Sequence, residues 1–287
     1  MMYTVFTSIV LLSVTGILSG VILFFVAKKF QITEDPRIDA VESVLPGVNC
    51  GGCGYPGCRK FAEACVRAQD FDKLFCPVGG NKGMVEVSKI LGLEVAEKEV
   101  KIAVVRCNGS LKNRPRINEY DGQARCKIVH NLYTGETGCS FGCLGLGDCV
   151  RVCKFGAIEI DEQTQLPMID EEKCTSCGAC VKACPRFLIE LRYRGKNHQR
   201  IFVACSNPEK GNIARKNCSA ACIGCGKCFK VCSFDAIKIG ENLAYINYKK
   251  CTLCRKCVNE CPTGAIHEIN FNLVRSRQAQ NPNVSIV

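Results

Sequence analysis

The chain has 287 residues with 25 cysteines, and its formal net charge is +11 at pH 7. Disulfide scaffolds are equally rich in cysteine, but they are usually short secreted domains, so the length argues against one. The positive charge is not gathered into a basic stripe with interleaved aromatic residues, which argues against nucleic-acid binding. Most of the cysteines fall into tight runs, and this favours metal clusters.

The N-terminal segment is predicted to be a single membrane-spanning helix. Residues 3–27 carry no charged side chain, and a helix of that length, at about 1.5 Å per residue, crosses a bilayer. Lys28 and Lys29 follow directly, so the positive-inside rule places the rest of the chain on the cytoplasmic side of the membrane that this helix anchors it to. A cleaved signal peptide is the competing interpretation. The lack of a basic N-terminal region and the many thiols disfavour it.

The first cysteine set lies in a glycine-dense loop over residues 46–58, and a further Cys-Pro pair follows after 17 intervening residues. Glycines allow the backbone to approach a cluster closely and to donate N–H groups to its sulfurs. We predict one four-iron cluster on the cysteines of this loop and the later pair: Cys50, Cys53, Cys58 and Cys76. A structural zinc is the alternative. A helix is expected from Arg59 to about Gln69, with Cys65 as a buried thiol on its face.

Two runs near the C-terminal end, 222–232 and 251–261, both have the spacing C-x2-C-x2-C-x3-C. In bacterial two-cluster ferredoxins with this spacing, the fourth cysteine of each run binds the cluster of the other run. This rule predicts two four-iron clusters, one on Cys222, Cys225, Cys228 and Cys261, and one on Cys232, Cys251, Cys254 and Cys257. Alternating apolar residues over 237–246, with a turn at 240–242, predict a hairpin between the runs.

An earlier pair of runs, 139–153 and 174–184, follows the same plan less regularly. Its first run has Leu146 where the middle cysteine is expected, and leucine cannot bind iron, so Cys139 is the natural substitute. We predict one cluster on Cys139, Cys143, Cys149 and Cys184, and one on Cys153, Cys174, Cys177 and Cys180. A three-iron cluster that lacks one ligand is the alternative for the first. Asp148 beside this loop is a candidate to tune its potential.

The two pairs of runs have similar flanks, which indicates an internal duplication. A strand-like stretch ends at Cys107 before the first pair and at Cys205 before the second. Cys139 precedes Cys143 by four residues, as Cys218 precedes Cys222. Apart from Cys65, four cysteines remain without an assigned cluster, and they are candidates for a sixth cluster across the two units: Cys107, Cys126, Cys205 and Cys218. Buried or free thiols are the alternative.

Together these segments predict an α+β fold: an N-terminal transmembrane helix, a small α-rich [4Fe-4S] domain and two duplicated bacterial-type ferredoxin modules. The expected boundaries are 1–29 for the anchor, 30–99 for the first cluster domain and its linker, 100–198 and 199–269 for the two strand-plus-ferredoxin modules, and 270–287 for a flexible tail. Five or six bound clusters at about −2 each would offset most of the positive charge.

The loop Cys-Gly-Gly-Cys-Gly-Tyr-Pro-Gly-Cys at 50–58, with the apolar segment before it and the ferredoxin runs behind it, resembles the B subunit of the Rnf complex. This complex is the ion-translocating ferredoxin:NAD oxidoreductase of bacteria and some archaea. The resemblance extends to about Asn270 and is to the longer form, which has two ferredoxin modules. It implies an electron-transfer subunit of a translocase, with soluble ferredoxin and other membrane subunits as partners.

No residue pattern for substrate chemistry is evident. No G-x-G-x-x-G motif follows an expected strand and no P-loop is present, so we expect no catalytic residue and no flavin or NAD site on this chain. The predicted function is that of a membrane-anchored electron-transfer subunit. It receives electrons from ferredoxin and passes them to a complex that couples NAD reduction to ion translocation. Two alternatives remain: a wiring subunit of another membrane oxidoreductase or of a system that reduces a redox regulator, and a zinc-binding scaffold.

Overall fold

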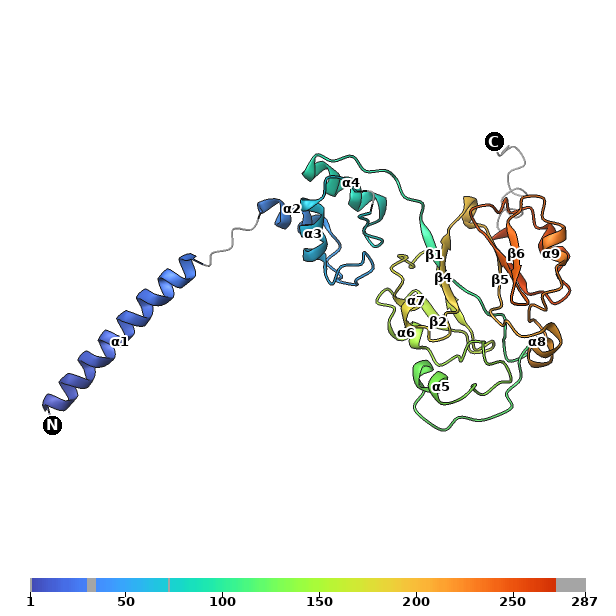
Figure 1. Ribbon diagram of the computed structural model, residues 1–287, viewed down its shortest axis with the longest axis horizontal. Coiled ribbons are helices and arrows are strands. Elements are labelled where there is room, and N and C mark those ends of the chain that lie inside the picture. The colour runs from blue at the N-terminus through green and yellow to red at the C-terminus, as the bar shows by residue number, and fades with distance from the viewer. Residues whose placement is uncertain (1, 30–34, 72, 272–287) are drawn as a thin grey trace.

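The structure is a computed structural model that describes residues 2–29, 35–71 and 73–271 (Figure 1). Helix α1 (Met2–Lys29) stands apart from the rest of the chain, and its side chains are exposed wherever they are described. Its part Val5–Lys29 is long and apolar enough to cross a membrane. The predicted apolar helix is confirmed. The predicted flexible tail lies outside the described residues except for Asn270 and Phe271.

Three helices form what we call the N-terminal cysteine domain: α2 (Pro36–Val44), α3 (Cys58–Arg67) and α4 (Gly80–Leu91). Helix α2 begins where the Asp35 carboxylate accepts a hydrogen bond from the backbone N–H of Arg37 at 2.9 Å, which satisfies a free donor of the first turn. The three helices pack through buried apolar side chains, among them Val41, Phe61 and Met84. The long loop between α2 and α3 carries the first cysteines and is held against this core.

The next part, which we call module 1 (residues 101–193), contains two small antiparallel sheets. Its elements in chain order are β1 (Lys101–Val105), α5 (Cys126–Leu132), α6 (Asp148–Arg151), β2 (Ile158–Ile160), β3 (Pro167–Ile169), α7 (Ala179–Ala183) and β4 (Ile189–Tyr193). Strand β1 pairs with β4, and β2 pairs with β3. The short helices α6 and α7 lie beside these sheets and carry cysteines at their N-terminal ends.

Module 2 (residues 200–269) repeats this order after the short 3-10 turn η1 (Lys196–His198). Its elements are β5 (Arg200–Val203), α8 (Gly211–Asn217), α9 (Lys227–Lys230), β6 (Ile237–Gly240), β7 (Leu243–Ile246), α10 (Lys256–Asn259) and β8 (Ile266–Ile269). Strand β5 pairs with β8, as β1 pairs with β4. Strands β6 and β7 form the predicted hairpin, with Ile237 opposite Ile246. The repeated element order supports the duplication inferred from the sequence.

The two modules pack against each other through an apolar layer and the buried side chain of Arg192. Ile102 and Val104 of β1 form a common core with Phe202 and Ala204. The guanidinium of Arg192 in β4 is 1% exposed. It lies 5.6 Å from the ring centre of Phe202, 5.2 Å from that of Tyr245 and 5.6 Å from that of Tyr248. Desolvated cation–π contacts of this kind are each worth up to about 2 kcal/mol, so the modules are held in one arrangement.

Candidate iron–sulfur sites

Four cavities of the described structure are each lined by four cysteines. The four sets are Cys50, Cys53, Cys58 and Cys76; Cys126, Cys143, Cys149 and Cys184; Cys222, Cys225, Cys228 and Cys261; and Cys232, Cys251, Cys254 and Cys257. Three of these are the sets expected from spacing, and the exchange of the fourth cysteine between runs is visible in module 2. The remaining set departs from the expectation at one residue.

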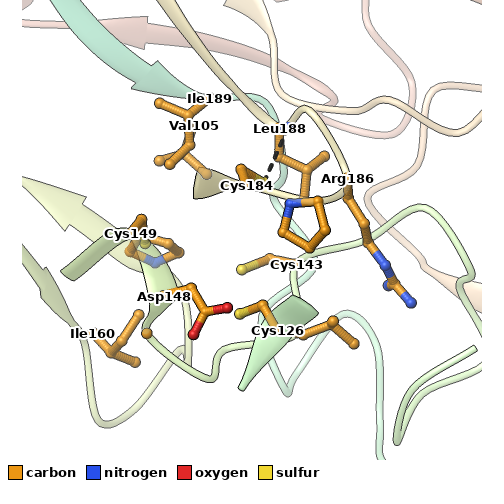
Figure 2. Close-up of a pocket in the computed structure, with 14 residues that line it drawn as sticks. Val105, Cys126, Cys143, Asp148, Cys149, Ile160, Cys184, Arg186, Leu188 and Ile189 are labelled. Carbon is orange, nitrogen blue, oxygen red and sulfur yellow. Dashed lines mark hydrogen bonds between the residues drawn. The ribbon is translucent and has the colours of Figure 1, made fainter. Parts of the chain in front are cut away.

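That departure concerns the first run of module 1. Cys126, at the start of α5, lines the cavity with Cys143, Cys149 and Cys184 (Figure 2). Cys139 was expected there. Burial raises the pKa of the Cys126 thiol, while hydrogen bonds from the backbone of Asp148 and Leu146 lower it. The Cys126 thiol therefore lies against the loop that lacks its middle cysteine, and it replaces Cys139 in our assignment.

The backbone of this loop keeps the path seen in the three regular runs. The residue before the middle ligand position has a positive φ in all four cases: 72° at Gly145, 64° at Ser176, 64° at Gly224 and 61° at Leu253. The loop around Leu146 thus winds like a cluster loop, although its middle residue has no thiol. A ligand from outside the run completes the set, and α5 provides it.

Asp148 holds α5 in position. Its carboxylate accepts a hydrogen bond from the backbone N–H of Lys127 at 3.0 Å, and it forms an ion pair with Arg151 at 2.6 Å and a longer one with Arg125 at 3.8 Å. The first contact joins α6, which carries Cys149, to the start of α5. Because its charge is balanced by two arginines, Asp148 acts here mainly by positioning Cys126.

The second set of module 1 gathers around α7. Burial, with a contribution from the nearby thiols of Cys174 and Cys177, raises the pKa of the Cys180 thiol to about 12. Cys153 packs against the same small core as Cys174 and Cys180. The structure therefore brings together the four cysteines expected for this cluster.

The four remaining cysteines outside α3 meet between the modules, and each is at most 9% exposed: Cys107, Cys139, Cys205 and Cys218. We call them the bridging set. Burial raises the pKa of the Cys218 thiol, and the nearby thiols of Cys107 and Cys139 contribute. Burial raises that of Cys205 to about 11, with Cys222 and Cys107 contributing. The side chain of Asn207 donates a long hydrogen bond, 3.7 Å, to the Cys139 sulfur.

The bridging set is close to the buried guanidinium of Arg114 and the half-buried one of Arg186. Arg114 is 6% exposed and donates to the backbone oxygens of Gly109 and Cys143 and to the Thr137 hydroxyl. Arg186 donates to the backbone oxygens of Cys139, Gly142 and Thr134. These cations are placed to offset negative charge at the surrounding cysteines, because their interaction is weakly screened in the interior.

The N-terminal set lies next to module 1. A Cβ atom on Gly52 would lie 3.0 Å from the Cα, Cβ and carbonyl oxygen of Cys177, and the Lys154 ammonium donates to the Val48 carbonyl at 3.3 Å. Cys65 is fully buried in the helical core and does not line the cavity. Burial raises the pKa of the Cys65 thiol to about 12, in keeping with its interpretation as a packed thiol.

The chemistry of these sets fits iron–sulfur clusters. Backbone N–H groups point at cysteine sulfurs at 3.3 to 3.5 Å, as Gly79 does to Cys76, Gly145 to Cys143 and Leu188 to Cys184. Such bonds tune a cluster. Four thiolates buried side by side would repel one another without bound metal charge.

Cys126, and not the expected Cys139, lines the cavity of module 1, and we therefore propose to exchange the two residues in the assignment. The duplication contained the signal: Cys107 corresponds to Cys205, and Cys139 corresponds to Cys218. Of these cysteines, Cys126 is the one without a counterpart in module 2. Leu146 is likewise the one position in the ferredoxin runs where another residue replaces a ligand. Pairing the duplicated cysteines with one another leaves Cys126 for the incomplete run.

Family models match three stretches of the chain. A model described as "Putative Fe-S cluster" matches residues 45–73. A model described as "4Fe-4S dicluster domain" matches residues 138–188 and again 221–265, and a second model with the same description matches 173–236. These matches cover the N-terminal cysteine domain and both modules, so the chain carries iron–sulfur clusters.

Similar proteins span nearly the whole chain. The B subunit of the Na(+)-translocating ferredoxin:NAD(+) oxidoreductase complex of Acetobacterium woodii is 42% identical over 93% of this chain and 78% of its own length. The B subunit of the ion-translocating oxidoreductase complex of Methanosarcina acetivorans is 40% identical, with 90% of this chain and 96% of that protein covered. The proton-translocating counterpart of Clostridium ljungdahlii is 38% identical over 98% of both. The chain therefore belongs to the family of B subunits of the ion-translocating (Rnf) oxidoreductase complexes.

Proposed function

We propose that this chain is the membrane-anchored iron–sulfur subunit that accepts electrons from reduced ferredoxin and passes them to a complex coupling NAD reduction to ion translocation. The observation that carries this proposal is the series of four-cysteine sets running through the whole described body. Substrate chemistry is left to partner subunits, since the sets bind cofactors and no residue on this chain is assigned a catalytic role.

The cysteine sets follow one another without a break. Gly52 of the N-terminal site touches Cys177, and Cys180 lies near Cys149 of the neighbouring set in module 1. The backbone N–H of Cys143 donates to the Cys107 sulfur at 3.4 Å, which links module 1 to the bridging set. Each step joins residues of adjacent sets, so this half of the series ends between the modules.

The second half runs through module 2. Cys205 of the bridging set lies near Cys222, and Cys228 lies near Cys257 of the last set. Without the bridging set, the two modules would each hold a pair of sites with nothing between them. We therefore assign it a sixth [4Fe-4S] cluster, with Cys107, Cys139, Cys205 and Cys218 as ligands.

Bound clusters would supply one-electron chemistry at fixed positions. The chain holds the sites in sequence, keeps most of them from water and balances their charge with Arg114 and Arg186. The Lys28–Lys29 pair at the end of α1 supports a cytoplasmic position for the body, where soluble ferredoxin is the donor and the membrane subunits of the complex are the acceptors.

The test removes the bridging cluster and retains the clusters of both modules on either side of it. In the intact complex, the double variant Cys107→Ser/Cys218→Ser should retain the clusters of both modules yet lose most NAD reduction by reduced ferredoxin. Cys65→Ser is the matched control, since this buried thiol lies outside every set, and it should keep its activity. Unchanged ferredoxin-to-NAD turnover in the double variant would show that electrons do not pass through the bridging set, and it would refute the proposed series of sites. A wild-type complex without this turnover would refute the function itself.

A further inference from the structure

The stretches that hold the two ferredoxin runs have opposite charge in the two modules, although the modules share a fold. In module 1 this stretch is residues 143–184, where four basic and seven acidic side chains give a balance of −3. The corresponding stretch of module 2, residues 222–261, has seven basic and three acidic side chains, a balance of +4. The duplication provides the same scaffold for both, so the difference reflects what each module faces.

Module 2 also presents its cluster sites to the surface. Among the cysteines, all of which lie in the described part of the chain, Cys225 and Cys254 are exposed and the others are buried or half-buried. These two are the middle ligands of their runs and occupy equivalent positions. An electron carrier that docks from solution must approach a site where the protein cover is thin, and these positions provide it.

A lysine follows each exposed cysteine by two residues. Lys227 follows Cys225, Lys256 follows Cys254, and both lysines are exposed. The ion pairs described in this module are those of Arg255 with Glu268, of Lys250 with Asp235 and of Arg200 with Glu171 of module 1. Lys227 and Lys256 are therefore not paired with any carboxylate of the described residues, and their charge is directed to solvent.

The equivalent positions of module 1 carry no lysine and are already covered. Ala179 and Asp148 occupy them. The cysteine corresponding to Cys254, Cys177, is in contact with Gly52 of the N-terminal cysteine domain. The position corresponding to Cys225 is Leu146, against which Cys126 of α5 lies. In module 1 these positions are therefore internal contacts, whereas in module 2 the described residues leave Cys225 and Cys254 exposed. Figure 1 shows module 2 on the side of module 1 away from α2–α4.

We infer that the surface of module 2 at the starts of the contacting helices α9 and α10 is the docking surface for an acidic, soluble one-electron carrier protein. Cys225 and Cys254 are exposed there, and Lys227 and Lys256 are its charged contacts. This inference rests on the proposed function, because the carrier is the ferredoxin proposed as donor. Opposite charges steer diffusional encounter and orient the partner, and salt weakens both effects. Electrons thus arrive at the two sets of module 2 and travel toward the N-terminal cysteine domain.

The test measures the second-order rate constant for ferredoxin oxidation by the intact complex at several ionic strengths. The variant Lys227→Glu/Lys256→Glu should lower this constant about tenfold or more at low salt and flatten its salt dependence. Lys227→Arg/Lys256→Arg should keep the wild-type values. Lys182→Glu is the matched control, an exposed lysine two residues after Cys180 of module 1, and it should have little effect.

Two further measurements separate docking from other roles. Reduction of the clusters by dithionite, which needs no protein docking, and their EPR spectra should be the same in the variant and the wild type. If the Glu variant oxidises ferredoxin as fast as Lys182→Glu at all salt concentrations, the docking surface is wrong even though the function stands. If the variant changes the spectra or the dithionite reduction but not the salt dependence, the lysines only balance cluster charge, and the inference also fails.

Discussion

At the scale of single residues, the exchange of Cys126 for Cys139 makes a prediction about which cysteines share a cluster. In our assignment Cys107 and Cys139 hold the same cluster, whereas Cys126 belongs to another. Removing two ligands of one cluster should release no more iron than removing one. Cys107→Ser/Cys139→Ser should therefore lose one cluster, about four irons per chain, whereas Cys107→Ser/Cys126→Ser should lose two clusters, about eight irons per chain.

Iron analysis of the two double variants after anaerobic purification measures this difference. The assignment expected from spacing alone, with Cys139 in module 1 and Cys126 between the modules, predicts the reverse order. Equal losses in the two variants would contradict both assignments.

Arg114 is predicted to raise the reduction potential of the bridging site. Its buried guanidinium lies near the Cys218 thiol and hydrogen-bonds the Cys143 backbone, and a positive charge in the interior favours the more negative, reduced form of a cluster. Arg114→Gln should lower one cluster potential by on the order of 60 mV, a tenfold shift of a one-electron equilibrium. Redox titration followed by EPR measures it.

Two variants control for packing and for remote charge. Arg114→Lys retains the cation and should retain most of the potential. Arg116→Gln removes an arginine whose side chain is 54% exposed and pairs with Glu136, and it should leave the potential unchanged. A potential that does not move in Arg114→Gln would show that solvent or other charges already balance this site.

At the scale of elements, the contact between the N-terminal cysteine domain and the loop before α7 of module 1 depends on Gly52. Because an added Cβ would meet backbone and side-chain atoms of Cys177 at 3.0 Å, Gly52→Val should weaken this contact by about 1–3 kcal/mol. The iron content should stay constant while ferredoxin-to-NAD turnover falls. Gly83→Ala, on α4 with no atom within 4 Å of its added Cβ, should have no effect on turnover.

The outcome that contradicts this prediction is normal turnover in Gly52→Val with normal iron content. It would mean that the N-terminal set is not reached through Cys177. Loss of iron from the N-terminal site would instead show that the loop, not the contact, had been damaged, and the smaller Gly52→Ala would then be the variant to compare.

Several elements were predictable from sequence because their cause is local. The apolar helix, the helix after Cys58 and the β6–β7 hairpin follow from periodicity and turn residues, and the structure has them at α1, α3 and 237–246. Regular cysteine spacing predicted three of the four cysteine-lined cavities. The place of Cys126 was not predictable in the same way, because α5 reaches its cavity from 17 residues before Cys143 through a tertiary contact at Asp148.

At the scale of the whole molecule, the account requires one orientation in the membrane. Lys28 and Lys29 at the end of α1 are expected to stay in the cytoplasm. A C-terminal tag on the full chain should therefore resist protease in intact spheroplasts and be cleaved in inverted membrane vesicles. A tag that is cleaved from outside intact spheroplasts would overturn the proposed position of the cluster-bearing body.

Iron, acid-labile sulfide and zinc per chain, measured on anaerobically purified protein, test the central claim most directly. Six four-iron clusters predict about 24 irons, as many sulfides and no stoichiometric zinc. About eight irons per chain, or zinc without sulfide, would contradict the account.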